Sequence, residues 1–431
     1  MATPIEIWSP LPPDASGVAD YVEEQLPFLP EPEGITLVTE SPERVVSSVR
    51  ERYAVVSPSA RDANALRVYH IGNSPAHAFA YREAIARPGI VFLHEWNLHE
   101  LLLGFAVTSN DFRAYRDQMR REHGERGTIA AGAIADALGG RHWTSVFPLN
   151  AELLERALAV VCLAGSTAAK AAARLPGVPV LHLPHHAVLR SHASTRKDAR
   201  TRLNLDPDAP IILAPGLGTA SKALDTARAA LEKVRRGWPE ARLMTVGGEA
   251  RDDGSAGVRH LGRVDIETLG DALVAADVVL ALRFPSRGET SGVLMRALAA
   301  GRATVVSSGS TADEDLAHGV VARVSPGPSE VGELASLIEF LLGNADTRER
   351  MERLALVEAG RRDARALTKS FANFIDGVAA RRSELMDQVS TRSGRRRAGA
   401  GRWAAEIDGV VSNLGLARAP QGVFEKLEGL L

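Results

Sequence analysis

Short apolar runs alternate with amphipathic segments along most of the chain. A short run rich in β-branched residues predicts a buried strand, and an amphipathic segment of helical period between two runs predicts the helix that connects them. In the N-terminal half, this pattern predicts strands at Ile5–Trp8, Gly34–Val38, Ala65–Ile71, Gly89–His94, Ala159–Leu163 and Val178–Leu183. Strands that alternate with helices form parallel sheets, so the predicted fold class is α/β.

The C-terminal half repeats this pattern. Its predicted strands are Ile211–Ala214, Ala241–Val246, Val258–Leu261, Val278–Leu282, Ala303–Ser307 and Val320–Val324. Both halves begin with a strand, a loop rich in Pro and Gly, and a helix, which we expect at Val18–Leu29 and at Lys222–Arg236. We therefore expect two Rossmann-like lobes.

A polar segment at residues 187–209 separates the two halves and ends in the breaker sequence Asp206–Pro210. Such a segment is typical of a domain boundary. The sequence therefore predicts an N-terminal lobe over residues 1–195 and a C-terminal lobe over residues 205–385.

Residues 104–155 interrupt the alternation with a long charged stretch. Within it, Phe112, Tyr115 and Met119 recur at helical spacing and share one face. This segment predicts a helical insertion in the N-terminal lobe.

The tail at residues 386–431 changes character. Its stretch 392–402 is basic and Gly-rich, and an apolar helical segment, Trp403–Leu416, follows. We favour a linker before a helical tail, because the arginines are not interleaved with aromatic residues apart from Trp403. The alternative is a weak peripheral contact with an anionic membrane through 392–402.

Composition narrows the class of protein. Hydrophobic residues make up 45% and charged residues 24% of the 431 residues, which excludes a largely disordered chain. The formal net charge of −2 leaves no global basic field, so no nucleic-acid partner is expected. Cys162 is the single cysteine and lies in an apolar run, which indicates a reducing compartment. With no apolar run long enough to span a membrane and no signal sequence at the start, we expect a cytoplasmic protein.

The loop Gly216–Ser221 follows a predicted strand and approximates a dinucleotide-binding loop. Its sixth position is Ser221 rather than Gly, and Glu249 comes too late for the acid that binds a ribose. A Gly-rich turn that feeds a helix still offers backbone N–H groups to a phosphate, and Lys222 would add a positive charge beside them. A plain tight turn with an exposed lysine remains the alternative.

The segment from Leu280 to Val306 contains the densest group of side chains and amides that could bind a ligand. Its loop Gly288–Gly292 lies between a strand and a helix, where open α/β sheets bind anionic ligands. Glu289 can accept hydrogen bonds from sugar hydroxyls, while Thr290, Ser291 and the loop amides face a phosphate. A helix cap by a hydroxyl would explain these side chains but not the glycines and the carboxylate around them.

Several stretches of the chain match a known family: Trp8–Tyr21, Tyr69–Ser74, Pro88–His94 with Leu98 and His99, Gly216–Lys222, Ala275–Asp277 and Gly288–Gly301. Together, over nearly all of the chain, they resemble the retaining glycosyltransferases of family 4. Enzymes of this family use a nucleotide-sugar donor and have the GT-B fold, in which two Rossmann-like lobes face each other across a cleft.

The resemblance assigns roles to particular residues. Ser16 and Gly17 would form the N-terminal loop that faces the donor diphosphate, and Lys222 would match the lysine that neutralises it. His94 would correspond to the histidine that points into the cleft near the donor sugar and the acceptor.

The chain departs from the family pattern after Gly216. The arginine that usually follows this glycine is Leu217 here, and Arg283 or Arg263, each close after a strand, could supply the missing charge. The usual His-Ser pair after the strand ending near Leu163 reads Gly165-Ser166.

The family's pair of glutamates is also altered. Alignment of Ala297–Gly301 places Arg296 at the second glutamate and Gly288 at the first, so that Glu289 is shifted by one position. The ribose contact of the second glutamate and the identity of the donor are therefore open.

No metal site is expected. The spacing of His94 and His99 does not fit a zinc-binding H-E-x-x-H helix, and no strand is followed by Asp-x-Asp. The phosphate charge would then be met by Lys, Arg and helix N-termini, as in a metal-independent transferase without a cofactor.

The resulting prediction is a metal-independent, retaining hexosyltransferase of carbohydrate biosynthesis. It moves a sugar from a nucleotide-diphosphate sugar to a carbohydrate, a lipid-linked or another hydroxyl acceptor, with His94 and Glu289 as catalytic residues. The predicted donor-binding residues are Ser16, Gly17, Gly216, Lys222, Arg263, Arg283, Thr290, Ser291, Gly292 and Arg296. The alternatives are a non-catalytic, sugar-nucleotide-binding or scaffold subunit and a sugar-nucleotide epimerase on the same fold.

Overall fold

The computed structural model describes residues 3–14, 16–29, 32–136, 138, 143–216, 223–248, 256–311 and 313–395. These residues divide into two compact units. The first comprises the described part of 3–184 together with Arg287–Thr290 and 364–395, and the second comprises that of His185–Ser286 and Ser291–Asp363.

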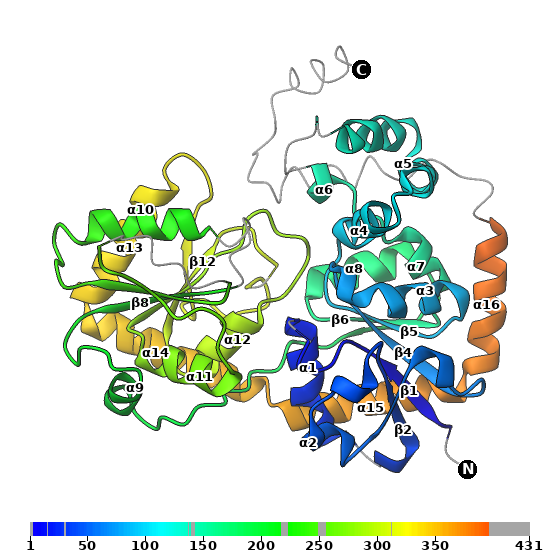
Figure 1. Cartoon of the computed structure of the whole chain (residues 1–431), viewed down its shortest axis with the longest axis horizontal. Coiled ribbons are helices and arrows are strands. Elements are labelled where there is room, and N and C mark those ends of the chain that lie inside the picture. Colours follow the sequence, from blue (N-terminus) through cyan, green and yellow to red (C-terminus); the bar gives the residue numbers. More distant parts are fainter. Residues whose placement is uncertain are drawn as a thin grey trace. The chain divides into compact units, whose positions relative to one another are not determined.

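The described part of the first unit contains a seven-stranded parallel sheet in the order β3-β2-β1-β4-β5-β6-β7 (Figure 1). Its strands are β1 (Ile5–Trp8), β2 (Ile35–Val38), β3 (Ala54–Val56), β4 (Leu66–Ile71), β5 (Ile90–Leu93), β6 (Ala159–Cys162) and β7 (Val180–His182). The six strands predicted for this half are present, and β3 is an additional edge strand.

Helices cover both faces of this sheet. The helices of the described part of this unit are α1 (Gly17–Gln25), α2 (Ser47–Arg50), α3 (Ala78–Ala86), α4 (His99–Ser109), α5 (Phe112–Ala135), α6 (Trp143–Val146), α7 (Ala151–Arg156), α8 (Gly165–Arg174), α15 (Ala364–Ala380) and α16 (Arg382–Arg395). Short 3-10 turns are η1 (Leu26–Phe28), η2 (Pro32–Gly34), η3 (Pro42–Arg44), η4 (Pro58–Ala60) and η5 (Pro75–His77). Figure 1 shows α1 and α15 on one face and α3, α7 and α8 on the other, which agrees with the two apolar cores of this unit.

The helical insertion is confirmed as α4 to α7, of which α5 lies farther from the sheet than α3 and α8 (Figure 1). Tyr115 and Met119 on α5 are buried, and Phe112 packs against them as the spacing predicted. The helix is interrupted at Gly124, whose φ of +66° places it in the left-handed region that glycine tolerates.

The described part of the second unit contains a six-stranded parallel sheet in the order β10-β9-β8-β11-β12-β13. Its strands are β8 (Ile211–Pro215), β9 (Arg242–Val246), β10 (Val258–His260), β11 (Val278–Ala281), β12 (Ala303–Ser307) and β13 (Ala322–Val324). Its helices are α9 (Arg196–Arg202), α10 (Leu224–Val234), α11 (Ile266–Ala275), α12 (Gly292–Ala299), α13 (Glu330–Gly343) and α14 (Ala345–Arg361). All six strands predicted for this half are present.

The chain crosses between the units at places other than the predicted boundaries. The second unit begins at His185, and the polar segment before β8 contains α9, anchored by an ion pair of 2.7 Å between Arg200 and Asp277. At its far end the second unit stops at Asp363 rather than at residue 385. Burial of Phe371 in the core of the first unit is the reason, because it fixes α15 there.

The start of the predicted linker is helical. Helix α16 continues to Arg395, and its Val389 is buried in the first unit. Arg392, the first residue of the basic stretch, donates from Nη2 to the carbonyl oxygen of Ala157 at 2.6 Å. The remainder of this stretch and Trp403–Leu416 lie outside the described residues. In the described ranges, no helix is long and apolar enough to cross a membrane.

Candidate functional site

Each sheet has a point at which its strand order reverses. It lies between β1 and β4 in the first unit and between β8 and β11 in the second. Loops at the carboxyl ends of strands next to such a switch point form the ligand site of open α/β sheets. Most of the predicted site residues follow one of these strands or a neighbour of them.

Ser16 and Gly17 lie at the switch point of the first unit, at the beginning of α1. The side chain of Ser16 caps the helix by accepting a hydrogen bond from the backbone N–H of Val18 at 3.2 Å. A Cβ added to Gly17 would meet no described atom within 4 Å, and its backbone does not have a positive φ. Neither the packing of the described residues nor the backbone conformation therefore explains why residue 17 is a glycine.

His94 follows β5 directly, and its side chain is 7% exposed. Its backbone N–H donates to the carbonyl oxygen of Ile71 at 2.9 Å, which extends the pairing of β5 with β4. Its Nε2 lies 2.9 Å from Nδ1 of His70, the penultimate residue of β4. Burial lowers the pKa of His70 to about 3, with a further contribution from His77.

Three asparagines hold the segment that follows His94. Asn73 accepts from the backbone N–H of Glu100 at 2.9 Å, and Asn97 accepts from that of His99 at 2.9 Å. Asn150 donates to the carbonyl oxygen of Trp96 at 2.6 Å. These hydrogen bonds come from the ends of different elements and fix the segment between β5 and α4.

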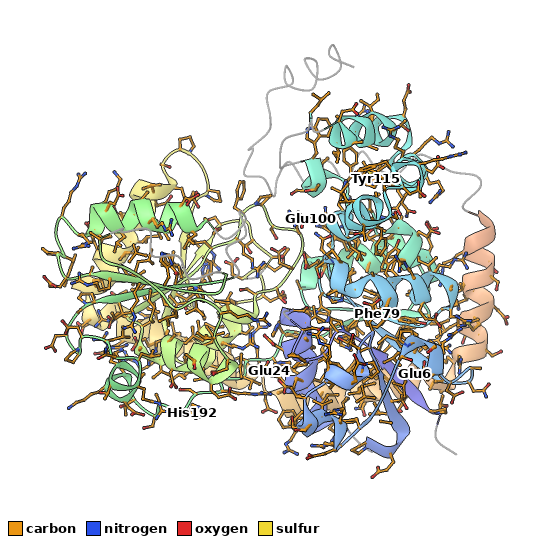
Figure 2. The ribbon with its side chains drawn as sticks, in the orientation of Figure 1. Glu6, Glu24, Phe79, Glu100, Tyr115 and His192 are labelled. Carbon is orange, nitrogen blue, oxygen red and sulfur yellow. The ribbon has the colours of Figure 1, made fainter. Side chains whose placement is uncertain are left out.

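The segment Arg287–Thr290 packs within the first unit. Glu289 is 5% exposed, and its carboxylate accepts a hydrogen bond from the backbone N–H of Arg287 at 2.5 Å. The guanidinium of Arg287 forms a two-pronged ion pair with Glu100, one contact of which is 2.5 Å. Glu100 lies near the beginning of α4 (Figure 2). Glu289 and His94 therefore belong to the same compact unit, although the sequence analysis assigned Glu289 to the C-terminal lobe.

In the second unit, α12 begins at the switch point. Ser291 caps this helix by accepting from the backbone N–H of Leu294 at 3.2 Å. The buried guanidinium of Arg296 reaches back over the first turn, since a Cβ added to Gly292 would lie 2.9 Å from its Nη1. The same Cβ would lie 3.7 Å from Nε2 of His185. The cation therefore lies at the positive end of a helix, where an anion is normally favoured.

The other predicted residues are dispersed along the carboxyl edge of the second sheet. Gly216 follows β8 and donates to the carbonyl oxygen of Val246 at 2.7 Å. Arg283, partly buried after β11, donates its backbone N–H to Ser307 at 3.0 Å. Arg263, after β10, is exposed. Lys222 and Leu217 lie outside the described residues.

Acidic and histidine side chains do not gather into a metal site within the described ranges. There, no group of three or more His, Cys, Asp or Glu side chains could hold an ion. Independence of a metal stays a prediction, as do the individual site residues.

A model of the family described as glycosyl transferases group 1 matches residues 209–344, which is most of the second unit. Residues 209–344 are a group 1 glycosyltransferase domain. This match confirms the predicted enzyme class, whereas membership of family 4 stays a prediction. A search of curated proteins finds no match.

Solved structures resemble the chain over most of its length. HepE from Anabaena, in complex with UDP and glucose, has a TM-score of 0.58 at 11% identity and covers 87% of this chain and 100% of its own. The glycosyltransferase WaaG, involved in lipopolysaccharide biosynthesis, has a TM-score of 0.58 at 12% identity, covering 86% and 100%. The sucrose-phosphate synthase of Thermosynechococcus elongatus has a TM-score of 0.57 at 16% identity, covering 88% and 100%. The fold is therefore GT-B, as predicted.

Sequence reasoning missed two contacts of this region. The first is the ion pair of Glu100 with Arg287, whose partners are 187 residues apart. The second is the hydrogen bond between His70 and His94. A signal for the second was present, because His70 is the penultimate residue of one predicted strand and His94 is the last residue of the next predicted strand along the chain.

Proposed function

We propose that the chain is a retaining, metal-independent glycosyltransferase of family 4 that transfers a sugar from a nucleotide-diphosphate sugar to a hydroxyl acceptor. The observation that carries this proposal is the placement of Arg296 over the first turn of α12 in a group 1 glycosyltransferase domain. A guanidinium and a helix N-terminus that face the same point together stabilise an anionic ligand there. A diphosphate is such a ligand.

In this mechanism the leaving diphosphate is held by the amides at the beginning of α12, by Arg296 and by the loop that begins at Gly216. Lys222, which lies outside the described residues, is expected to add its charge to that of Arg296. As the bond from the sugar to the diphosphate breaks, positive charge develops on the sugar, and the buried carboxylate of Glu289 stabilises it. The acceptor oxygen attacks from the face that the diphosphate leaves, so the configuration is retained.

The remaining proton comes from the acceptor hydroxyl. It passes to an oxygen of the departing diphosphate, which becomes more basic as the bond breaks. His94 then orients the sugar or the acceptor through a hydrogen bond. No metal is required, because the phosphate charge is met by arginine, lysine and backbone dipoles.

UDP-glucose is the first donor to test, because HepE binds UDP and glucose. The acceptor is a carbohydrate, a lipid-linked or another hydroxyl compound, and the protein acts in the cytoplasm. A non-catalytic subunit that binds a sugar nucleotide is the second candidate, because Arg296 stands where the family's second glutamate is expected.

Purified protein incubated with UDP-, GDP-, ADP- and dTDP-sugars tests the proposal. We expect one donor to raise the Tm and to be transferred or slowly hydrolysed, with retention seen by proton NMR. Turnover should survive exhaustive chelation by EDTA, since no step uses a metal. Binding without turnover would favour the non-catalytic subunit, and activity restored only by manganese would contradict the metal-independent mechanism.

Replacement of Gly17 by alanine tests the loop at the beginning of α1. We expect Gly17→Ala to weaken binding of the donor about tenfold, or about 1.4 kcal/mol, and to leave the Tm unchanged. The added methyl meets no described atom of the protein, but it would stand where a phosphate approaches the helix N-terminus. Calorimetry with the donor measures the affinity.

Gly377→Ala, in α15, is the matched control, because its added Cβ also meets no described atom within 4 Å. It should bind the donor as the unchanged protein does. Equal affinity of the two variants would show that the loop at Gly17 does not face the diphosphate.

A further inference from the structure

The imidazoles of His70 and His94 form a buried pair on one face of the first sheet. His70 is fully buried on β4 and His94 is 7% exposed after β5. The distance of 2.9 Å between Nδ1 of His70 and Nε2 of His94 is that of a hydrogen bond. One of these two nitrogens must therefore carry a proton and the other a lone pair.

Aromatic rings surround this pair. The ring of Phe92 stacks on His70 at 4.5 Å and on His94 at 4.8 Å between centroids. Tyr21 from α1 forms a T-shaped contact with His94, with 5.1 Å between the ring centroids. Such surroundings disfavour a charge, and burial lowers the pKa of His70 to about 3 with the help of His77. His70 is therefore neutral at physiological pH and carries a single ring proton.

The second nitrogen of His70 decides which tautomer is present. Among the described residues, its buried Nε2 has no hydrogen-bond partner. If His94 donated to His70, the only proton of His70 would be on this Nε2, and a buried N–H would be left without an acceptor. If His70 donates, only a lone pair is left there. In folded proteins, a buried N–H without an acceptor is rarer than a buried lone pair without a donor.

We propose that His70 is a positioning residue that donates its Nδ1–H to Nε2 of His94 and so holds the proton of neutral His94 at Nδ1. The assignment of tautomers does not depend on the proposed function, whereas the role of His94 in sugar transfer rests on it. In that reaction, His94 donates a hydrogen bond to an oxygen of the sugar or of the acceptor and does not act as a base. Its Nε2 lone pair is occupied by His70, so the acceptor proton goes to the leaving diphosphate oxygen as the new bond to the sugar forms.

Nitrogen-15 NMR of the protein labelled at histidine, without substrate, tests the tautomers directly. Single substitutions assign the signals of His70 and His94. We expect Nδ1 protonated and Nε2 bare on both rings, with a scalar coupling across the hydrogen bond. A protonated Nε2 on His94, or a mixture of both tautomers, would overturn the proposal, and neither result depends on whether the protein transfers a sugar.

Variants of His70 separate positioning from folding. His70→Leu removes the donor, and we expect His94 to lose its single-tautomer signature and turnover to fall about tenfold or more with little change in KM for the donor. His70→Asn keeps an N–H donor near the same position and should restore both. If His94 keeps one tautomer in His70→Leu, the proposal is wrong.

His99→Leu is the control for the loss of a buried histidine. His99 is fully buried and hydrogen-bonds to the carbonyl oxygen of Phe147 and to Tyr115, not to His70 or His94. Its loss should lower the Tm and leave the signals of His94 in place. A change in the tautomer of His94 as large as that in His70→Leu would assign the effect to general loosening of the unit and overturn the role of His70.

Discussion

Lowering the pH from 6.5 to 4.5 is expected to remove about 2 kcal/mol from the free energy of unfolding of the first unit for each of three fully buried histidines, or about 6 kcal/mol together. His123 of the same unit, whose pKa burial also lowers to about 4, adds a loss in the same direction. His70, His77 and His99 are buried, and burial lowers their pKa to about 3, about 4 and about 4. In the unfolded chain each regains its usual pKa near 6.5. The unfolded state then binds protons that the folded state cannot, so stability is present above pH 6.5 and is lost as the pH falls toward 4.

Hydrogen exchange of peptides from β4 and β5 at a series of urea concentrations and pH values measures this dependence in the first unit alone. His77→Asn is the matched variant, because its amide can still donate to the carbonyl oxygen of His70, which His77 Nδ1 contacts at 3.0 Å. It should lose about 2 kcal/mol less stability over the same range. A free energy of unfolding that stays constant between pH 6.5 and 4.5 would show that these histidines are not neutral in the folded state.

The strands could be predicted from sequence because each is a short apolar run with its own boundaries. Twelve predicted strands are present in the two sheets. The missed strand, β3, has three residues, lies at the sheet edge and begins with an exposed alanine. It therefore lacks the buried apolar run from which a strand is predicted. A local pattern identifies a strand most readily where burial on both faces imposes an apolar run.

The path of the chain between the units was less predictable. The amphipathic face of α15, with Phe371, Ile375 and Val378, predicts a packed helix but does not say which core receives it. That choice depends on the shape of a surface built from β1 to β6, far away in the sequence. The same limit applies to the contact of Glu100 with Arg287, since a glutamate near the beginning of a helix has many possible partners along the chain.

The candidate site could be predicted because its polar residues and glycines lie at the carboxyl ends of predicted strands. Ser16, Gly216 and Ser291 come after a predicted strand, and His94 ends one. The strand order puts all four at or beside the switch points. The hydroxyls of Ser16 and Ser291 are used as helix caps, and for Ser291 this is the alternative that the sequence analysis gave. What they leave for a ligand is the row of backbone amides that the caps hold in place.

Glu289→Gln is expected to lower turnover about 100- to 1000-fold, or about 3 to 4 kcal/mol in transition-state stabilisation, with KM for the donor changed by less than about threefold. In the unchanged protein, the carboxylate of Glu289 accepts a hydrogen bond of 2.5 Å from the backbone N–H of Arg287. The amide oxygen of glutamine can still accept this hydrogen bond, so the substitution removes the negative charge and keeps the local hydrogen bond. Charge develops on the sugar only as the bond to the diphosphate breaks. The lost interaction therefore belongs to the transition state rather than to the bound donor.

Steady-state kinetics with the donor identified in the screen measures this effect, and thermal unfolding accompanies it. Glu358→Gln, in α14, is the control, because Glu358 is as buried as Glu289 and pairs with Arg362 at 3.0 Å. It should lower the Tm and leave kcat near its original value. If Glu289→Gln instead raises KM in proportion to any loss of kcat/KM, the carboxylate binds the ground state, and stabilisation of the developing charge must come from another group.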